Sequence, residues 1–209
     1  ELNRPFELTL IDDCSLDNTP VVIREFAKGK LDVRALSNDK NLGRGGTFKK
    51  GAELVKGLYV GFLDIDLEVS ASYIPEVIGA LDQGADVATI DRHYIVKWTP
   101  SFLLRTILSR GYKRLVRRRL NIPLKDTETG FKFFRTSSYH RIADLCHNDQ
   151  WFWDTEVMAI AHFKGLTIKE LPGEFKKNRN KKSTVRVVPD TIAYFKELKK
   201  FRKRLNDIV

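Results

Sequence analysis

The sequence is poor in the residues that hold small proteins together through disulfides or metal clusters. Its two cysteines, Cys14 and Cys146, lie far apart and form no CxxC pair. A disulfide framework is therefore excluded, and a reduced cytosolic setting with two structural thiols is favoured. The four histidines show no metal-ligand spacing. No window holds about 18 or more apolar residues, so the sequence predicts no transmembrane helix in this chain.

The first residue is Glu1 rather than an initiator methionine, and no signal segment precedes the first expected strand. We therefore expect the sequence to begin inside something longer or after processing. A length of 209 residues suits one α/β domain with a sizeable core. The hydrophobic fraction of 42% and the charged fraction of 31% are those of a folded protein.

Basic residues outnumber acidic ones by 37 to 27, and the excess is concentrated in two blocks. The first block contains no acid and comprises Lys97, Arg105, Arg110, Lys113, Arg114, Arg117, Arg118 and Arg119. The second block runs from Lys176 to Arg204. Such patches suit nucleic acid, an anionic membrane surface or a phosphorylated substrate. A solvated helix face is the usual explanation of a charge run, but it does not predict the absence of acids.

Segments typical of strands and helices alternate along the first half of the chain. The expected strands cover residues 7–12, 31–36, the first half of 58–68, and 86–90, and the expected helices cover 20–28, 47–56 and 73–82. This alternation predicts an α/β fold with a mostly parallel, doubly wound sheet flanked by helices. The active site of such a sheet lies at the carboxyl ends of its strands. The aspartates at predicted strand ends are Asp12, Asp13, Asp64, Asp66 and Asp91.

The second half begins and ends with amphipathic basic helices. The expected elements are a helix at 102–120, a strand at 131–134, helices at 137–146 and 154–163, a strand at 166–171 closed by Pro172, and a last helix from about 190. We expect one domain over residues 1–189 and a C-terminal basic amphipathic helix over 190–209.

Two carboxylates at i and i+2 follow the apolar strand that starts at Leu58. In extended backbone, residues two apart point the same way, so Asp64 and Asp66 would aim at one spot. Carboxylate oxygens suit Mg²⁺ or Mn²⁺ carrying a phosphate-bearing substrate. A solvated turn, where aspartate is common, explains the pair about equally well.

Several segments, taken in order, carry a resemblance to a known family. They are Ile11–Thr19, Asn41–Gly51, Asp64–Glu68, Arg92, Arg105–Arg110, Asp126–Lys132 and Trp153–Glu156. Together they resemble the inverting family 2 glycosyltransferases with the GT-A fold, and within them the dolichyl-phosphate or polyprenyl-phosphate mannose and glucose synthases. The resemblance implies a βα unit before Asp12, and about thirty residues of that kind do not precede it here. Either the chain is a fragment or its donor site is incomplete.

The resemblance implies a donor site for a nucleotide sugar, GDP-mannose or UDP-glucose. The residues assigned to the nucleotide are Asp12, Asp13, Gly43, Gly45, Asp64, Arg179 and Ser183, and those assigned to Mg²⁺ or Mn²⁺ are Asp64, Asp66 and Glu68. Asp13 could also cap a helix, and Gly43 and Gly45 could serve a plain turn. In similar synthases Arg179 and Ser183 match a basic loop over the pyrophosphate.

The resemblance also implies an acceptor site for a polyprenyl phosphate. The residues assigned to catalysis are Asp126, Arg92, Arg105, Arg110 and Glu156. The three arginines lie where similar synthases clamp phosphates, a task that suits guanidinium groups. A lipid phosphate is largely ionised at pH 7, so a strong base is dispensable. The alternative is a family 2 glycosyltransferase acting on a polysaccharide or protein hydroxyl, and for a sugar hydroxyl acceptor Asp126 or Glu156 would be the base.

The two basic amphipathic helices are the expected membrane contacts of an enzyme peripheral to the cytosolic face of a membrane. No nucleic acid partner is expected, because acidic strand ends repel phosphate unless metal is bound. A basic nucleic-acid-binding domain and an inactive glycosyltransferase-like protein remain alternatives. Salt-sensitive RNA binding would favour the former.

Overall fold

The computed structural model describes residues 4–94, 111–176 and 187–208, and all structural statements below concern these residues. The elements are β1 (Leu8–Asp12), α1 (Thr19–Ala27), β2 (Val33–Ser37), α2 (Gly43–Ala52), β3 (Tyr59–Leu63), η1 (Ala71–Tyr73), α3 (Ile74–Asp82), β4 (Val87–Tyr94), β5 (Phe131–Arg135), α5 (Thr136–Ala143), α6 (Trp153–Phe163), β6 (Ile168–Phe175) and α7 (Val187–Ile208). Residues 111–120 form a further helical segment.

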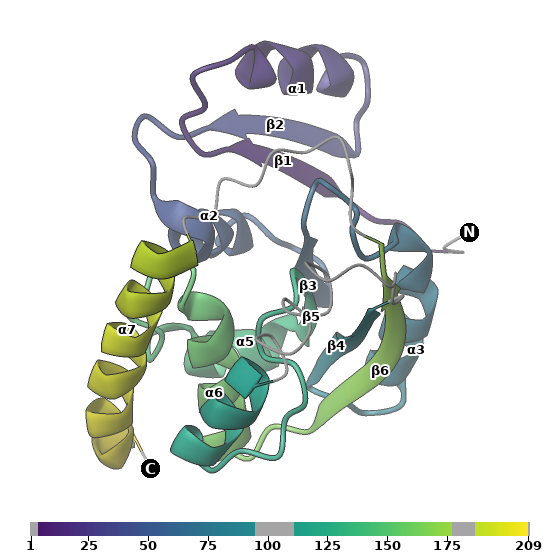
Figure 1. Ribbon diagram of the computed structural model, residues 1–209. Helices are drawn as coiled ribbons and strands as arrows, with labels where there is room; N and C mark the ends of the chain where they lie inside the picture. Colours follow the sequence, from purple (N-terminus) through teal and green to yellow (C-terminus); the bar gives the residue numbers. More distant parts are fainter. Residues whose placement is uncertain (1–3, 95–110, 177–186, 209) are drawn as a thin grey trace.

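The strands form two hydrogen-bonded sheets (Figure 1). In the first, β1 and β2 pair in parallel. In the second the order is β3-β5-β4-β6, with β4 and β6 parallel over eight register pairs and β5 antiparallel to both neighbours. The predicted α/β class is confirmed. The sheet is rich in parallel pairs, and β5 is the strand that reverses direction.

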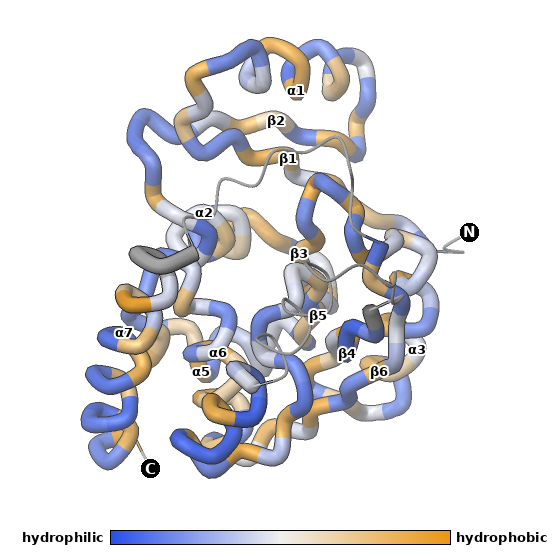
Figure 2. Tube along the Cα trace, viewed as in Figure 1, coloured by the Kyte–Doolittle hydropathy of each residue, from blue (hydrophilic) through white to orange (hydrophobic). Residues whose placement is uncertain are grey.

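The main core lies between the larger sheet and the helices α2, α5, α6 and α7. Trp153 at the start of α6 is fully buried, and its ring lies 4.9 Å from that of Phe48 on α2. The helix α7 adds Leu198, Phe201 and Leu205 to the same cluster. Most of its other described residues are hydrophilic (Figure 2), but Ile192 and Phe195 on this helix are also exposed. The domain boundary expected between residues 189 and 190 falls within the first turn of α7.

A smaller core covers the opposite part of the sheet. It gathers Val77 and Leu81 of α3 against Ile90 of β4 and Phe131 of β5. The first residue of β5 therefore packs in this smaller core, and Phe134 of the same strand packs in the main one. The strand at the centre of the sheet is consequently covered on both faces, as its phenylalanine-rich sequence requires.

Several predicted boundaries are wrong, and three of them extend an element beyond its expected limit. The helix expected at 47–56 begins at Gly43, the strand expected to end at Pro172 runs on to Phe175, and the strand expected to end at Ile90 continues to Tyr94. Proline fits within β6 because β6 is an edge strand, where one missing N–H leaves no ladder bond unmade. The parallel pairing with β6 then carries β4 beyond Asp91.

The N-terminal layer is thinly packed. The helix α1 contains no buried residue, and Val21, Val22 and Phe26 on it are at least half exposed. Among the described helices, none is long and apolar enough to cross a membrane.

Candidate active site

Asp13 fixes the start of α2 from a distant part of the chain. Its carboxylate accepts hydrogen bonds from the backbone N–H groups of Leu42 and Gly43, both at 2.8 Å, and from the side-chain amide of Asn38 at 2.9 Å. Burial alone would raise the pKa of Asp13, but these donors hold it below its ordinary value. The neighbouring Asp12 is buried and accepts the N–H of Ser15.

The predicted glycines of α2 pack against the loop that leads into α6. A side-chain carbon at Gly43, whose φ is +77°, would lie 2.6 Å from the Asp149 carbonyl oxygen. One at Gly45 would lie 2.6 Å from Trp153. The glycines therefore allow close packing of the helix. The predicted approach of their backbone to a nucleotide stays a prediction.

Arg44 connects the first predicted metal ligand to a buried carboxylate. One terminal nitrogen of its guanidinium lies 2.8 and 2.9 Å from the two oxygens of Asp64, and the other donates to Asp154 at 2.8 Å. The remaining oxygen of Asp154 accepts from the fully buried Lys132 at 2.6 Å. Burial raises the pKa of Asp64 and lowers that of Lys132, against the opposing charges. Asp64, Arg44, Asp154 and Lys132 thus form a row of ion pairs in which two anions alternate with two cations.

The loop before β5 meets the end of β3 at Gly130. The N–H of Asp64 donates to the Gly130 carbonyl at 2.9 Å. A side-chain carbon at Gly130 would lie only 1.9 Å from an Asp64 carboxylate oxygen. This close approach explains the glycine in the predicted acceptor motif and joins that motif to the predicted metal pair.

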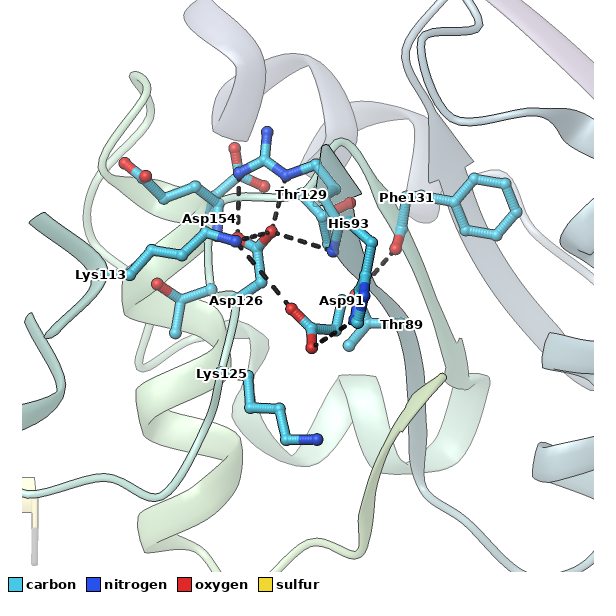
Figure 3. Close-up of polar contacts among 12 residues, drawn as sticks. Thr89, Asp91, His93, Lys113, Lys125, Asp126, Thr129, Phe131 and Asp154 are labelled. Carbon is cyan, nitrogen blue, oxygen red and sulfur yellow. Dashed lines mark hydrogen bonds and ion pairs between the residues drawn. The ribbon is translucent and has the colours of Figure 1, made fainter. Parts of the chain in front are cut away.

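Asp126 lies fully buried between two cations (Figure 3). Arg92 from β4 donates to both of its oxygens, at 2.7 and 2.9 Å, and Lys113 from the helical segment 111–120 donates at 2.7 Å. Burial would raise the pKa of Asp126, but Arg92 and Lys113 hold it far below its ordinary value. Sequence reasoning paired Arg92 with Asp126 in one site, and the structure brings them together.

Glu128, two residues further along this loop, has the opposite character. Burial, with Asp126 and Asp154 nearby, raises its pKa to about 7 against the attraction of Arg92. Its backbone N–H donates to Asp126 at 3.1 Å. One loop thus carries a carboxylate fixed in the charged form and a carboxyl that titrates near neutral pH.

Asp66 and Glu68 follow Asp64 on the loop after β3 and are partly buried. The Glu68 N–H donates to the Asp66 carboxylate at 3.3 Å, and Leu67 between them adopts a positive φ of 52°. Within the described ranges, no group of three histidine, cysteine, aspartate or glutamate side chains is arranged to hold a metal. Three hard carboxylates close in sequence nevertheless fit Mg²⁺ or Mn²⁺ in donor chemistry.

Glu156 is directed to a different part of the molecule. It is buried on α6, forms an ion pair with Arg204 of α7 and accepts the backbone N–H of Asn148 at 2.8 Å. These contacts tie α7 to α6. The predicted residues Arg105, Arg110, Arg179 and Ser183 lie outside the described residues.

Sequence reasoning assigned no role in the active site to Arg44, Lys113, Lys132 or Asp154, and it expected Lys113 on a helix that contacts the membrane. The sequence contains a signal for one of them, because Lys132 stands between Phe131 and Phe133 in a strand expected to be buried. A lysine at the centre of an apolar strand needs a buried anion. The identity of that anion, Asp154, could not be read from spacing.

A layered α/β sheet with carboxylates at its strand ends and a glycine-rich helix start beside them defines the class of GT-A-fold glycosyltransferases. A structure of glucosyl-3-phosphoglycerate synthase from Mycobacterium tuberculosis with Mn²⁺, UDP-glucose and glycerol 3-phosphate superposes with a TM-score of 0.63. The identity is 18%, over 93% of this chain and 67% of that one. The mannosyltransferase PcManGT from Pyrobaculum calidifontis, in complex with GDP-Man and Mn²⁺, gives a TM-score of 0.54 at 14% identity, over 83% of this chain and 48% of that one. These similarities establish the fold.

The chain belongs to glycosyl transferase family 2, whose family model matches residues 2–143. It is 30% identical over 173 residues to glycosyltransferase AglD of Haloferax volcanii, over 80% of this chain and 27% of that protein. It is 24% identical over 189 residues to the dolichyl-phosphate beta-glucosyltransferase of Saccharomyces cerevisiae, and this match covers 80% of this chain and 56% of that protein. The human protein of the same name is 27% identical, and the match covers 79% of this chain and 54% of that protein. The chain thus spans from about a quarter to just over half of these relatives.

Proposed function

We propose that this chain transfers a hexose, with inversion, from a nucleotide-diphospho-sugar to a polyprenyl or dolichyl phosphate. The names of the yeast and human relatives favour glucose as the sugar and a dolichyl phosphate as the acceptor. The bound UDP-glucose and GDP-Man of the structural neighbours support UDP-glucose or GDP-mannose as the donor.

The state of Asp126 is the observation that carries this proposal. Arg92 and Lys113 occupy its oxygens and hold its pKa far below neutrality. Such a carboxylate is a poor acceptor of a hydroxyl proton, since a general base works best with a pKa near the operating pH. An acceptor that is already ionised, such as a phosphate monoester with a second pKa of about 6, needs no such base.

In the proposed reaction an acceptor phosphate oxygen attacks the anomeric carbon of the donor. The bond from that carbon to the nucleoside diphosphate breaks, and the diphosphate leaves with the bonding electrons. A divalent cation, when bound, supplies charge neutralisation for the leaving diphosphate. Asp64, Asp66 and Glu68 would hold it. Arg92 and Lys113 contribute positive charge beside the acceptor loop, and Gly130 lets that loop lie against Asp64.

A basic groove between α7 and the helical segment 111–120 supports contact with an anionic membrane surface. Leu115, Phe195 and Leu198 contribute apolar lining, and the basic side chains along it are Arg119, Lys199, Arg202 and Lys203. Among the described residues, no acidic side chain lines this groove. In this proposal the protein is peripheral to the cytosolic face of a membrane.

The proposed reaction is tested with the full-length protein, a polyprenyl phosphate in vesicles, Mg²⁺ or Mn²⁺, and labelled UDP-glucose or GDP-mannose. Organic-extractable label is the expected result. Asp64→Ala and Asp66→Ala should each abolish label transfer with unchanged circular dichroism, whereas Asp32→Ala, an exposed aspartate, should not. The absence of extractable label with both donors would refute the proposal.

The carboxyl group of Glu128 supports a second candidate function within the same family, which is transfer of the sugar to a sugar hydroxyl. A carboxyl with a pKa of about 7 could take the hydroxyl proton. In that case the rate with a soluble sugar acceptor should rise with pH through about 7 and be lost in Glu128→Gln. If transfer to a polyprenyl phosphate is retained in Glu128→Gln, the first proposal stands.

A further inference from the structure

Arg44 contacts both carboxylate oxygens of Asp64, which would be the oxygens available to a divalent cation. One of its nitrogens lies 2.8 Å from one Asp64 oxygen and 2.9 Å from the other. The backbone of Asp64 is fixed on both sides, because its N–H donates to Gly130 and its carbonyl accepts from Leu67. These hydrogen bonds oppose a shift of the main chain at Asp64. A change of partner for the Asp64 carboxylate, away from Arg44, must therefore come from movement of the side chains.

The other end of the guanidinium is held more firmly. It donates to Asp154, whose side chain is 3% exposed, while that of Asp64 is 38% exposed. The guanidinium carbon lies 4.5 Å from the centre of the Trp151 ring. Asp154 also forms an ion pair with Lys132. Loss of the Asp64 contact thus leaves Arg44 anchored, whereas loss of the Asp154 contact would leave a buried anion with one partner.

We infer that Arg44 is an exchangeable counter-ion of Asp64. It neutralises Asp64 until a divalent cation arrives, and its freed nitrogen then binds an oxygen of the diphosphate that accompanies the cation. This inference rests on the proposed function, since it takes Asp64 as a cation ligand and a nucleoside diphosphate as the group delivered with the cation.

Electrostatics gives the exchange its direction. A divalent cation and a guanidinium on the same carboxylate would repel each other across a few ångströms, so each weakens the binding of the other. A diphosphate relieves this repulsion because it offers oxygens to both. Cation and diphosphate should therefore bind with positive coupling, and by linkage each should raise the affinity of the other by the same factor.

The experiment is a titration of the full chain with Mn²⁺, followed by the electron paramagnetic resonance signal of free Mn²⁺, without nucleotide and with UDP or GDP. Arg44→Gln should bind Mn²⁺ alone about tenfold more tightly than the wild type, which corresponds to about 1.4 kcal/mol. With Mn²⁺ present, the same variant should bind the diphosphate about tenfold more weakly. A merely structural role would not change the two affinities in opposite directions.

Lys49→Gln is the matched control. It removes the same charge from the same helix, but the ammonium of Lys49 binds Asp149, 2.7 Å away. Both of its affinities should equal those of the wild type. Arg44→Lys guards against a folding defect, because lysine keeps the charge but cannot bridge two carboxylates as a fork. Its Mn²⁺ affinity should lie between those of the wild type and Arg44→Gln.

Unchanged or weaker binding of Mn²⁺ alone by folded Arg44→Gln and Arg44→Lys would overturn the inference. The result is independent of turnover, because no acceptor is present. A chain that shows the opposed shifts but transfers no sugar would refute the proposed acceptor and retain the role of Arg44. A chain that transfers sugar without the opposed shifts would refute the role of Arg44 and retain the proposed acceptor.

Discussion

At the scale of single residues, Gly130 is the described glycine with the least space for a side chain. Its missing side chain leaves the space that the Asp64 carboxylate fills, 1.9 Å from where a side-chain carbon would stand. Gly130→Ala should displace that carboxylate and reduce sugar transfer by at least about a hundredfold, since misplacement of a reacting group by about 1 Å has that effect.

The control for this prediction is Gly79→Ala on α3, where nothing lies within 4 Å of the added carbon. That substitution should leave transfer unchanged and stabilise the helix by up to about 1 kcal/mol. Rates measured at saturating donor and Mn²⁺ check the pair. Equal rates in the two variants would contradict the importance of the contact between Gly130 and Asp64.

Glu128 should make the stability of the protein depend on pH. Burial raises its pKa in the folded state to about 7 from an ordinary value of 4.5. The folded chain therefore binds more protons than the unfolded chain between these values, and the free energy of unfolding contributed by this group falls as pH rises from about 4.5 to 7. The charged or titratable groups near it are Arg92, Asp126, Asp154, Tyr112 and Tyr194.

Glu128→Gln should flatten this part of the profile. Urea denaturation at pH 5 and at pH 7 is the measurement, and the wild type should lose more stability between the two than the variant. Asp126 adds little slope between pH 5 and pH 7, because its lowered pKa in the folded state and its ordinary value of 3.8 both lie below that range. Parallel profiles for the two proteins would show that Glu128 ionises in the folded state as it does in the unfolded one.

At the scale of elements, the start of α2 depends on a residue thirty positions away. Asp13 accepts the backbone N–H groups of Leu42 and Gly43, which would otherwise lack partners at the helix start. Asp13→Ala should lower the free energy of unfolding by about 1 kcal/mol, as loss of a helix cap does. For a chain of this length the melting temperature should fall by about 2–4 °C.

Asp17 provides the comparison for this measurement. Its carboxylate, in an exposed loop, accepts a hydrogen bond from the backbone N–H of Thr19 at 2.9 Å. Asp17→Ala should therefore cost less than Asp13→Ala. An equal or larger cost would mean that the contacts of Asp13 do not determine where α2 begins.

The same helix shows how far the sequence predicts the structure. Apolar runs and the carboxylates that follow them were sufficient to predict the strands and the positions of Asp12 and Asp64 at strand ends, since both depend on local pattern. Asp91 was also expected at a strand end, but it lies within β4 because pairing with β6 extends that strand to Tyr94. The helix start at Gly43 and the direction of β5 were not predicted, because both depend on partners remote in sequence. The ion pairs of Asp154 with Arg44 and Lys132 were not predicted for the same reason, because these partners lie 110 and 22 positions from Asp154 in the sequence.

At the scale of the whole molecule, packing is uneven between the N-terminal layer and the main core. The helix α1 has no buried residue, whereas nine consecutive residues of α6, from Trp153 to Ala161, are buried. Segments with few buried apolar contacts open at lower free energy than the rest of a protein. Backbone amides of α1 should therefore exchange with deuterium at least about a hundredfold faster than those of α6.

Hydrogen exchange measured by mass spectrometry at neutral pH checks this prediction. The helix α7 supplies an internal reference, because Leu198, Phe201 and Leu205 place one of its faces in the main core. Its amides near these residues should exchange more slowly than those of α1. Uniform protection across α1, α6 and α7 would contradict the unevenness of the packing.

The contact between Gly130 and Asp64 also constrains how such a chain can change by mutation. Glycine codons lie one base away from codons for alanine, serine, aspartate and several larger residues, and every one of these side chains begins with the carbon that collides with Asp64. Base changes that replace the glycine at position 130 should therefore be harmful as long as aspartate stands at position 64. A tolerated replacement of Gly130 should therefore be accompanied by a replacement of Asp64.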